Sequence, residues 1–359
     1  MPTTGDRLVS RAWRAPNRVC DVMSEQFIDL AAEPRVLREM LVAHGLVEAA
    51  ESPTIENLTG GVSSSIFKVT TRRGIYCVKQ ALPKLKVAKD WFAPVTRVFA
   101  EIAWLEVAGR LVPRQVPKLI ASDQDRGAFV MEYLPPAEYL NWKIELLAGR
   151  AFEVGAAVGR LLGTLHRATA RDSALAATFR TDENFYALRL EAYLVEAARQ
   201  HPALAPHLAA LVTTTQTHPF ALVHGDVSPK NILLGPHGPL LLDAECAWYG
   251  DPAFDLAFLL NHLLLKAAFR PELATQYGQV FQDIVASYLP HVTWEPVAQF
   301  EARAAALLPG LLLARIDGKS PVEYLDELTR AHVRKVAGTL IRAAEPTLIA
   351  VKAQCIGAA

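Results

Sequence analysis

The 359-residue sequence has little that could hold a disulfide-bonded or zinc-binding protein together. Its four cysteines, Cys20, Cys77, Cys246 and Cys355, lie far apart, and no two of them form a Cys-x-x-Cys pair. This spacing argues against the usual zinc and disulfide frameworks, and it favours scattered buried thiols in a reducing compartment. We therefore expect a cytoplasmic protein.

The sequence also lacks an excess of charge and a long apolar run. Lys and Arg together number 37, as do Asp and Glu, so the formal net charge is zero. Nothing in this balance favours nucleic acid or an anionic membrane surface as a partner. The apolar stretches at 256–265 and 304–314 are shorter than the ~18 residues that a membrane span needs. We expect neither a nucleic-acid nor a membrane partner, and a homodimer stays open.

Two regions of different character follow an N-terminal tail, which we assign to residues 1–24. Residues 25–134 combine helical spacing with short runs of β-branched and aromatic residues, so we expect strands at 55–58, 66–70, 75–80, 118–121 and 128–133 and a helix at 97–111. Two consecutive prolines at 135–136 break the chain. Residues 135–359 are mainly helical in pattern, with expected helices at 152–169, 186–199, 252–266, 272–288, 297–308 and 324–344.

One β-like island, at residues 221–242, interrupts the helical region. The sequence therefore predicts an α+β fold of two lobes, with a small antiparallel β lobe (25–134) and a larger, mainly helical lobe (135–359). A cleft between two such lobes is a usual place for a small-molecule site.

The β-like island carries the strongest chemical signal. Asp226 and Asn231 stand five residues apart between its apolar strands, and Asp243 ends the next strand. Asp and Asn also favour ordinary turns, but the order His-x-Asp-x4-Asn, apolar strand, Asp is that of the catalytic segment of kinases. One carboxylate can accept the proton of an attacking hydroxyl, and carboxylate and amide oxygens suit Mg²⁺. We expect Asp226 to be the catalytic base, and Asn231 and Asp243 to bind Mg²⁺ beside the phosphates of ATP.

A glycine pair in the N-terminal region is a candidate for phosphate binding. Gly60 and Gly61, followed by Ser63 and Ser64, lie between two expected strands. Glycine lets backbone amides approach phosphates closely, and serine hydroxyls add donors. A Gly-Gly hairpin is more often only a turn, so this segment gains its meaning from the rest of the pattern.

Lys79 lies in the middle of an expected strand, where a solvated lysine is the ordinary interpretation. In the kinase arrangement such a lysine instead faces the cleft and binds the α- and β-phosphates of the nucleotide. It then needs an anionic partner on the following helix. Glu101 is the first candidate and Glu106 the alternative, although either could be a solvated helix residue.

The expected last strand of the β lobe runs directly into the connector between the lobes. A strand that ends there exposes backbone hydrogen-bonding groups that adenine can use as an edge partner. We place the carbonyl of Glu132 and the amide of Leu134 in this role, with Met131 lining the pocket. The alternative is an interlobe hinge without a ligand.

With these motifs, residues 50–345 resemble the aminoglycoside phosphotransferase and choline kinase superfamily, whose fold is protein-kinase-like. The chain has His224-Gly225-Asp226 where protein kinases usually carry His-Arg-Asp, and Asp243 is not followed by Phe-Gly. The resemblance implies that Asp226 is the base, and that His224 and Asp255 support the catalytic loop. Simple helix capping is the alternative role for Asp255.

Within that superfamily the chain looks closest to the methylthioribose kinases. The segments 78–101, 243–245 and 248–255 carry this resemblance. It implies that Glu245 is a second carboxylate ligand of the metal and that Arg315 matches a substrate-side arginine, unless Arg315 faces solvent. The chain departs from that group by having Asn231, and Ala244 in place of Pro. The resemblance therefore supports the reaction class more than the substrate.

The expectation that follows is an ATP-dependent enzyme that transfers the γ-phosphate to a hydroxyl of a small molecule of the sugar, aminoglycoside or amino-alcohol type. The alternative is a nucleotide-binding pseudokinase that acts as a sensor or scaffold. A protein kinase is disfavoured because no Ala-Pro-Glu motif follows Asp243. The preference for ATP over GTP and the identity of the acceptor stay open at this stage.

Overall fold

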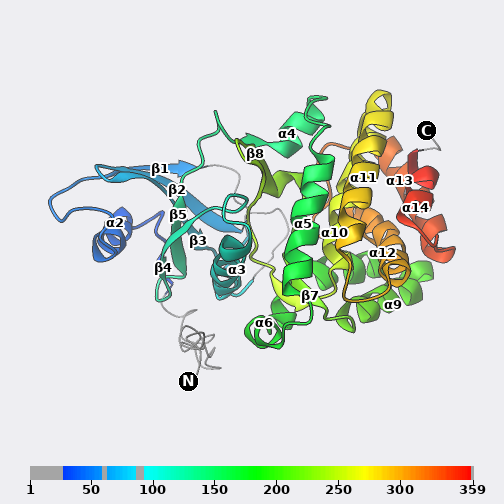
Figure 1. Cartoon of the computed structure of the whole chain (residues 1–359), viewed down its shortest axis with the longest axis horizontal. Helices are drawn as coiled ribbons and strands as arrows, with labels where there is room; N and C mark the ends of the chain where they lie inside the picture. The colour runs from blue at the N-terminus through cyan, green and yellow to red at the C-terminus, as the bar shows by residue number, and fades with distance from the viewer. Residues whose placement is uncertain (1–26, 59–62, 86–92, 357–359) are drawn as a thin grey trace, which may run out of the picture.

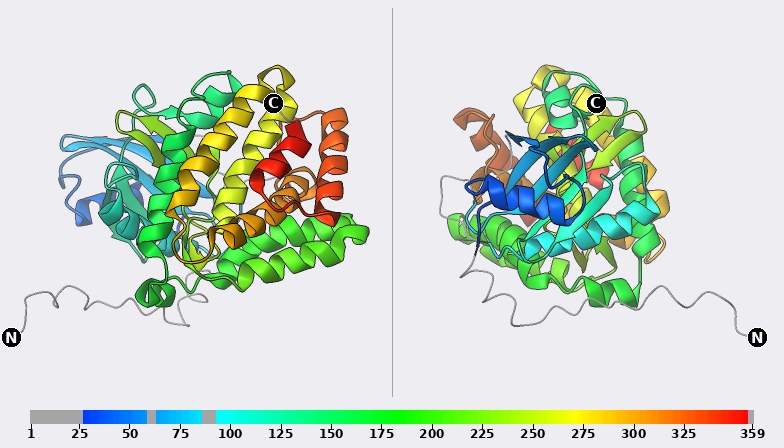
Figure 2. Two further views of the ribbon diagram at one scale, coloured as in Figure 1. Left: turned by 45° about the vertical axis from the view of Figure 1, so that its right-hand side comes forward. Right: turned by 90° about the vertical axis from the view of Figure 1, so that its left-hand side faces the viewer.

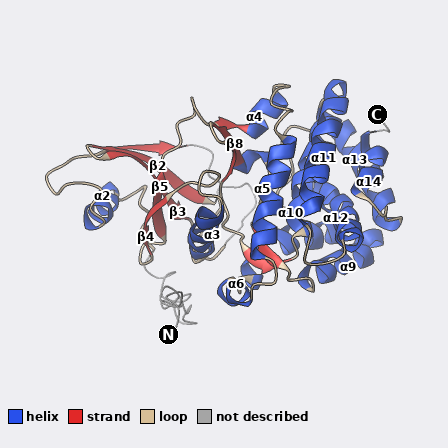
Figure 3. Cartoon of the chain, viewed as in Figure 1, coloured by secondary structure: helices blue, strands red, loops and turns tan. Residues whose placement is uncertain are grey.

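The protein is described by a computed structural model that covers residues 27–58, 63–85 and 93–356. These residues form two lobes, one built on a β-sheet and one mainly helical, as the sequence predicts (Figures 1 and 3). The lobes are joined by the segment that follows the last strand of the large sheet.

The small lobe is a five-stranded antiparallel sheet of order β1-β2-β3-β5-β4. Its tightest turn joins β2 and β3 at Gly74, whose φ of 151° suits glycine. One helix precedes the sheet and another interrupts it between β3 and β4. The elements are α2 (Pro34–Ala43), β1 (Thr54–Leu58), β2 (Ser64–Thr71), β3 (Gly74–Ala81), α3 (Arg97–Leu111), β4 (Leu119–Asp123) and β5 (Ala128–Glu132).

The two helices of this lobe cover opposite faces of the sheet. Leu37, Met40 and Leu41 of α2 pack with Val69 and Val78 in a small core of their own on the outer face (Figure 2). The buried side of α3 instead belongs to the large core that continues into the helical lobe. The α3 helix therefore connects the sheet to the helical lobe, and it lies between them in Figure 1.

The helical lobe begins with short elements and then stacks long helices. Its elements are β6 (Leu140–Asn141), α4 (Trp142–Leu147), α5 (Gly155–Thr169), α6 (Ser173–Thr178), α7 (Asp182–Phe185), a π-helix η1 (Tyr186–Val195), α8 (Glu196–Gln200), η2 (Pro202–Leu204), α9 (Ala205–Gln216), β7 (Ala221–Val223), η3 (Pro229–Asn231), β8 (Ile232–Gly235), β9 (Gly238–Leu241), β10 (Trp248–Gly250), α10 (Ala253–Phe269), η4 (Pro271–Leu273), α11 (Ala274–Tyr288), η5 (Leu289–His291), α12 (Val297–Asp317), α13 (Glu327–Arg342) and α14 (Leu348–Ile356). The central helix is α10, which is buried along almost its whole length.

By length and composition α12 alone among the described helices could cross a membrane, but most of its apolar window is buried inside the lobe. The helix was expected to end before Pro309, yet it continues to Asp317. Proline removes one helical hydrogen bond. Packing against α9 and α10 outweighs this loss, and a Cβ on Gly310 would come within 2.8 Å of Leu211. The following segment, 318–326, is not helical, although part of it was expected to be.

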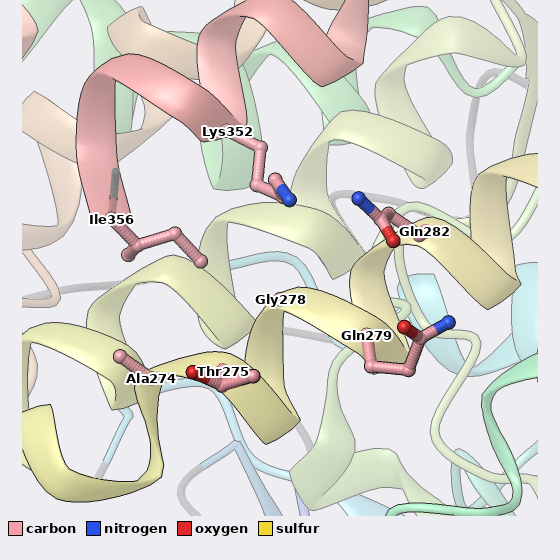
Figure 4. A pocket seen from close by; sticks show the side chains of 7 residues that line it. All are labelled: Ala274, Thr275, Gly278, Gln279, Gln282, Lys352 and Ile356. Carbon is pink, nitrogen blue, oxygen red and sulfur yellow. The ribbon is translucent and has the colours of Figure 1, made fainter. Parts of the chain in front are cut away.

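A small pocket lies between α11 and α14, on helices that carry none of the expected site residues (Figure 4). Gly278, Gln282 and Lys352 are among the residues that line it. The expected catalytic and metal-binding residues lie elsewhere, on β3, on α3 and in the loops around β7, β8 and β9.

Candidate active site

The backbone of the His-Gly-Asp segment explains why glycine stands at its centre. Gly225 has a φ of 79°, which is unfavourable for a residue with a side chain. A Cβ at this position would also lie 2.6 Å from the carbonyl oxygen of Cys246. The larger residue that protein kinases carry here therefore does not fit, and the chain can turn from β7 into the loop that presents Asp226.

Asp255, in the first turn of α10, stabilises the backbone of this loop through hydrogen bonds. Its Oδ2 accepts a hydrogen bond from the amide of His224 (2.7 Å) and its Oδ1 one from the amide of Gly225 (2.8 Å). Asp255 is fully buried, and its Oδ2 also contacts Nε2 of His166 at 3.2 Å. The backbone amide of Ala253, in the first turn of α10, donates its hydrogen bond to Oδ1 of Asp251 at 3.0 Å and not to Asp255. Asp255 therefore contacts the loop that it was expected to support.

The ring of His224 fixes the loop from its other side. Its Nε2 donates to the carbonyl of Leu242 (3.0 Å), and its Nδ1 accepts from the amide of Asp226 (3.2 Å). Burial lowers the pKa of His224, which agrees with a neutral ring carrying its proton on Nε2. The ring also packs edge-on against Trp104 of α3, with 4.9 Å between the centroids. His224 therefore connects the catalytic loop both to the strand before Asp243 and to the small lobe.

The Asp226 side chain is 18% exposed, and among the described residues the polar contacts of its carboxylate are made by one oxygen, Oδ2. Oδ2 accepts from Asn231 Nδ2 at 2.8 Å and contacts Arg189 Nη2 at 3.0 Å. Burial raises the pKa of Asp226, and the nearby charge of Arg189 opposes this effect. With Oδ2 held, Oδ1 is the oxygen left to receive a proton from an acceptor hydroxyl.

Arg189 is a site residue that no sequence motif indicated. It lies in the π-helix η1, a rare helix type that is frequent at functional sites. Its Nε donates to the carbonyl of Gly225 (2.5 Å) while Nη2 contacts Asp226. The expected regular helix at 186–199 gave no reason to single out this arginine, because only the tertiary structure brings η1 against the loop.

Lys79 of β3 joins the two lobes through three carboxylate oxygens. Its Nζ lies 2.8 Å and 2.7 Å from the two oxygens of Glu101 on α3, so the expected ion pair is present. The same ammonium also contacts Asp243, which follows β9. Burial lowers the pKa of Lys79, but the two carboxylates outweigh burial and leave it raised. Burial by itself would raise the pKa of Asp243, but the charge of Lys79 contributes to outweighing burial, so the pKa of Asp243 is lowered.

The residues around Asp243 suit a hard divalent cation. Asp243 has a φ of 68°, an uncommon backbone conformation that recurs at functional positions. Asn231 uses its Nδ2 to bind Asp226, which leaves its amide oxygen as the atom that could bind a ligand. No group of three or more His, Cys, Asp or Glu side chains in the described part of the chain is placed to hold a metal. The donor set of one carboxylate and one amide matches Mg²⁺, which usually takes few protein ligands and completes its shell with waters and phosphate oxygens.

A comparison with family models matches residues 54–286 to the phosphotransferase enzyme family. The chain belongs to this family. The chain is 25% identical to the methylthioribose kinase of Yersinia enterocolitica over 277 residues, which are 67% of each chain. It is 23% identical to the methylthioribose kinase of Bacillus thuringiensis over 340 residues, 81% of this chain and 85% of that one. These matches confirm the resemblance seen in the sequence.

Among solved structures, the ethanolamine kinase of Plasmodium vivax superimposes with a TM-score of 0.57 at 12% identity. The match covers 88% of this phosphotransferase and 92% of that kinase. At this identity the likeness shows the fold alone, and it confirms the protein-kinase-like arrangement of the two lobes.

Glu245 does not stand free beside Asp243. Its Oε2 accepts from Nε of Arg97 at 2.9 Å, and both side chains are buried. This ion pair engages Oε2 of Glu245, and the metal-ligand role expected for Glu245 stays a prediction. The remaining donors of Arg97 bind four backbone carbonyls around the start of α3, those of Ser63, Leu82, Ala93 and Pro94. The pair thus ties the segment after Asp243 to the small lobe.

The glycine loop of this phosphotransferase is only partly described. Gly60 and Gly61 lie outside the described residues. Ser63 and Ser64, which follow, are buried, and the Ser63 carbonyl accepts from Arg97. The hydroxyl of Ser64 has no hydrogen-bond partner among the described residues. It is therefore a buried donor that a phosphate oxygen could satisfy.

The three residues expected to contact adenine lie where β5 leaves the sheet. Met131 and Glu132 end β5, paired with Cys77 and Tyr76 of β3, and each is half-buried. Leu134 follows in the connector, and its amide has no backbone partner within the described ranges. Their role in nucleotide binding stays a prediction.

Arg315 does not point freely into solvent. It lies in the last turn of α12, half-buried, and its Nη1 contacts the hydroxyls of Tyr193 (3.3 Å) and Ser320 (2.9 Å). Its guanidinium also lies 5.8 Å from the centroid of the Tyr193 ring. The helical lobe therefore holds Arg315 beside η1, the same element that carries Arg189.

Proposed function

We propose that this phosphotransferase transfers the γ-phosphoryl group of ATP to a hydroxyl of a small molecule. The observation that carries the proposal is the contact between Lys79 of the small lobe and Asp243 of the helical lobe, with Asp226 held beside Asn231 on the neighbouring loop. Kinases need a cationic phosphate ligand, oxygen ligands for metal and a base in such an arrangement. Side chains suited to all three roles lie together here, which supports an active kinase over the pseudokinase alternative.

In the proposed reaction the acceptor hydroxyl donates a hydrogen bond to Oδ1 of Asp226. Its oxygen forms a bond to the γ-phosphorus while the bond from that phosphorus to the β–γ bridging oxygen breaks, and its proton passes to Asp226. Arg189 and Asn231 hold the other carboxylate oxygen, so the base keeps its orientation as its charge changes. The products are the phosphate ester and ADP.

Mg²⁺, held by Asp243 and Asn231, would neutralise charge on the nucleotide phosphates. Lys79 would bind the α- and β-phosphates, with Glu101 keeping the ammonium in position. Little covalent chemistry is left for the protein, so positioning and charge neutralisation supply most of the rate enhancement. We assign nucleotide binding to residues 25–134, with Met131, Glu132 and Leu134 at the adenine, and acceptor binding to residues 135–359.

We place the reaction in the cytoplasm, in keeping with the free thiols of Cys77, Cys246 and Cys355. The methylthioribose kinases among the relatives make a sugar one acceptor class to test. Aminoglycosides and amino alcohols are the others that the family likeness suggests.

The test is ADP formation by the purified protein across methylthioribose and other sugars, aminoglycosides, choline, ethanolamine and sugar acids. Asp226→Asn should lower kcat by about 10³-fold or more while nucleotide affinity, followed by calorimetry, stays within a few-fold. Asp182→Asn, which changes an aspartate in the first turn of α7, is the matched control. Full turnover by Asp226→Asn on an accepted substrate would remove Asp226 from the base role.

A further inference from the structure

Lys266, on α10, is a buried lysine without a countercharge. Its side chain is 1% exposed, and its Nζ has a single long hydrogen bond, 3.4 Å to the carbonyl of His262 in the preceding turn. The ammonium also lies 5.7 Å from the centroid of the Tyr324 ring. No carboxylate of the described ranges lies within ion-pair distance of it. Burying a charge in this way is costly unless something compensates it.

The neighbours of Lys266 add positive charge. Lys143 of α4 lies 6.0 Å from the centroid of the same Tyr324 ring, and Arg315 of α12 is close enough for its charge to act on Lys266. Burial, together with the charges of Lys143 and Arg315, lowers the pKa of Lys266 to about 7. Glu323 alone acts in the opposite direction, and its side chain is 66% exposed and already paired with Lys143. The cluster of Lys143, Lys266 and Arg315 therefore has more positive charge than its protein surroundings balance.

Two polar atoms of this cluster also lack partners. Nε of Arg315 and the hydroxyl of Tyr324 are buried without a hydrogen bond in the described structure. A buried donor left unpaired costs about 1–3 kcal/mol. Both atoms can donate, so the unsatisfied groups and the uncompensated charge require the same kind of partner, an anion.

The cluster adjoins the candidate base through two paths. Arg315 and Arg189 both lie against the ring of Tyr193, at 5.8 Å and 5.7 Å from its centroid, and Arg189 contacts Asp226. On the other side, Asn141, which precedes Lys143 by two residues, donates a hydrogen bond of 2.7 Å to the carbonyl of Lys230 in the catalytic loop. Tyr193 and Asn141 thus connect Arg315 and the start of α4 to the loop that carries the candidate base.

From this arrangement we propose that Lys143, Lys266 and Arg315 bind an anionic group of the phosphoryl acceptor, which is therefore a hydroxylated carboxylate or phosphate ester. This inference rests on the proposed function. Tyr324, from the segment 318–326 between α12 and α13, lies close to the two lysines. Anion binding to Lys266 therefore requires this side chain to move aside, and Lys143, 27% exposed, lies on the accessible side of the cluster.

The charge of the cluster separates three acceptor classes. An aminoglycoside or choline would place a cation beside a cluster of net positive charge, which is repulsive. A neutral sugar could hydrogen-bond to the cluster but would leave Lys266 uncompensated. A carboxylate or phosphate gains charge-assisted hydrogen bonds, which are about twice as strong as neutral ones.

The experiment compares acceptors in pairs that differ only in the anionic group: gluconate with glucitol, glycerate with glycerol, and ribose 5-phosphate with ribose. ADP formation gives kcat/KM for each. We expect the anionic member of at least one pair to exceed its neutral partner by about 10- to 100-fold, the usual effect of one or two charge-assisted contacts. The three pairs also distinguish a carboxylate from a phosphate ester.

Lys266→Met tests the cluster itself, with Lys335→Met on the exposed face of α13 as the matched control. Methionine has a similar shape without the charge, so we expect the folded protein to keep or gain thermal stability. For the anionic acceptor KM should rise about tenfold or more, with KM for ATP unchanged. Lys143→Gln at the rim should act in the same direction if Lys266→Met fails to fold.

The outcomes separate this inference from the proposed function. Transfer to neutral or cationic acceptors at least as fast as to their anionic partners would overturn the anion site and leave the kinase standing. Unchanged KM for the anionic acceptor in both variants would also overturn it. No transfer to any acceptor, with ATP bound normally, would remove the proposed function as well.

Discussion

Glu245 is the residue for which the structure and the family resemblance predict different results. If the carboxylate serves the ion pair with Arg97, Glu245→Gln leaves a buried guanidinium without its countercharge. Breaking a buried pair by removing one partner costs about 3–5 kcal/mol. Glutamine can still accept the bond from Nε, so we expect a loss of about 3 kcal/mol and a fall in Tm of several degrees.

The assay combines thermal unfolding with a Mg²⁺ titration of activity at saturating ATP. We expect the Mg²⁺ concentration for half-maximal activity to change by less than about threefold, because Asp243 and Asn231 keep their positions. Glu106→Gln is the matched control, since Glu106 lies on α3 like Arg97 but is exposed. It should alter neither quantity.

The refuting result is an unchanged Tm together with a tenfold or larger increase in the Mg²⁺ requirement. That outcome would return Glu245 to the metal and make its contact with Arg97 incidental. Arg97→Met gives a second check, because it also leaves four backbone carbonyls without their donors. It should destabilise the protein more than Glu245→Gln does.

Two further predictions concern buried cations. Arg189→Gln should lower kcat about 10- to 100-fold with KM for ATP unchanged. Arg189→Lys should not restore kcat, because lysine lacks the planar guanidinium that contacts both Asp226 and the Gly225 carbonyl. A wild-type kcat in Arg189→Gln would refute this role. Since burial lowers the pKa of Lys266 to about 7, the unfolded chain binds more protons than the folded chain between pH 7 and about 10. The free energy of unfolding should therefore rise with pH in that range. Between pH 7 and pH 9 the free energy of unfolding of the wild type, measured with urea, should rise by roughly 2 kcal/mol relative to that of Lys266→Met. If the free energies of unfolding of the two proteins change with pH in parallel, Lys266 does not have a lowered pKa in the folded protein.

Much of the site was predictable because its parts are close in sequence. The order and spacing of Asp226, Asn231 and Asp243 follow from one loop and the strands around it, so a short segment carries most of their geometry. The pairing of Lys79 with Glu101 was predictable for a similar reason, since one strand and the next helix pack together in this fold. The family comparisons agree with the reaction class that these residues predicted.

The contacts that the sequence did not reveal join segments far apart in the chain. Arg189 reaches Asp226 from a π-helix, and a helical pattern alone does not show that extra residue per turn. The family resemblance implied a metal-ligand role for Glu245, but it did not show that Arg97, 148 residues away, contacts one oxygen of its carboxylate.

The cluster of Lys143, Lys266 and Arg315 comes from three separate helices, and of these residues the family resemblance indicated only Arg315. The sequence by itself determined the chemistry of the catalytic loop, because backbone turns and local spacing orient those side chains. The tertiary structure decided which charges are buried together, because burial and ion pairing depend on how distant helices pack.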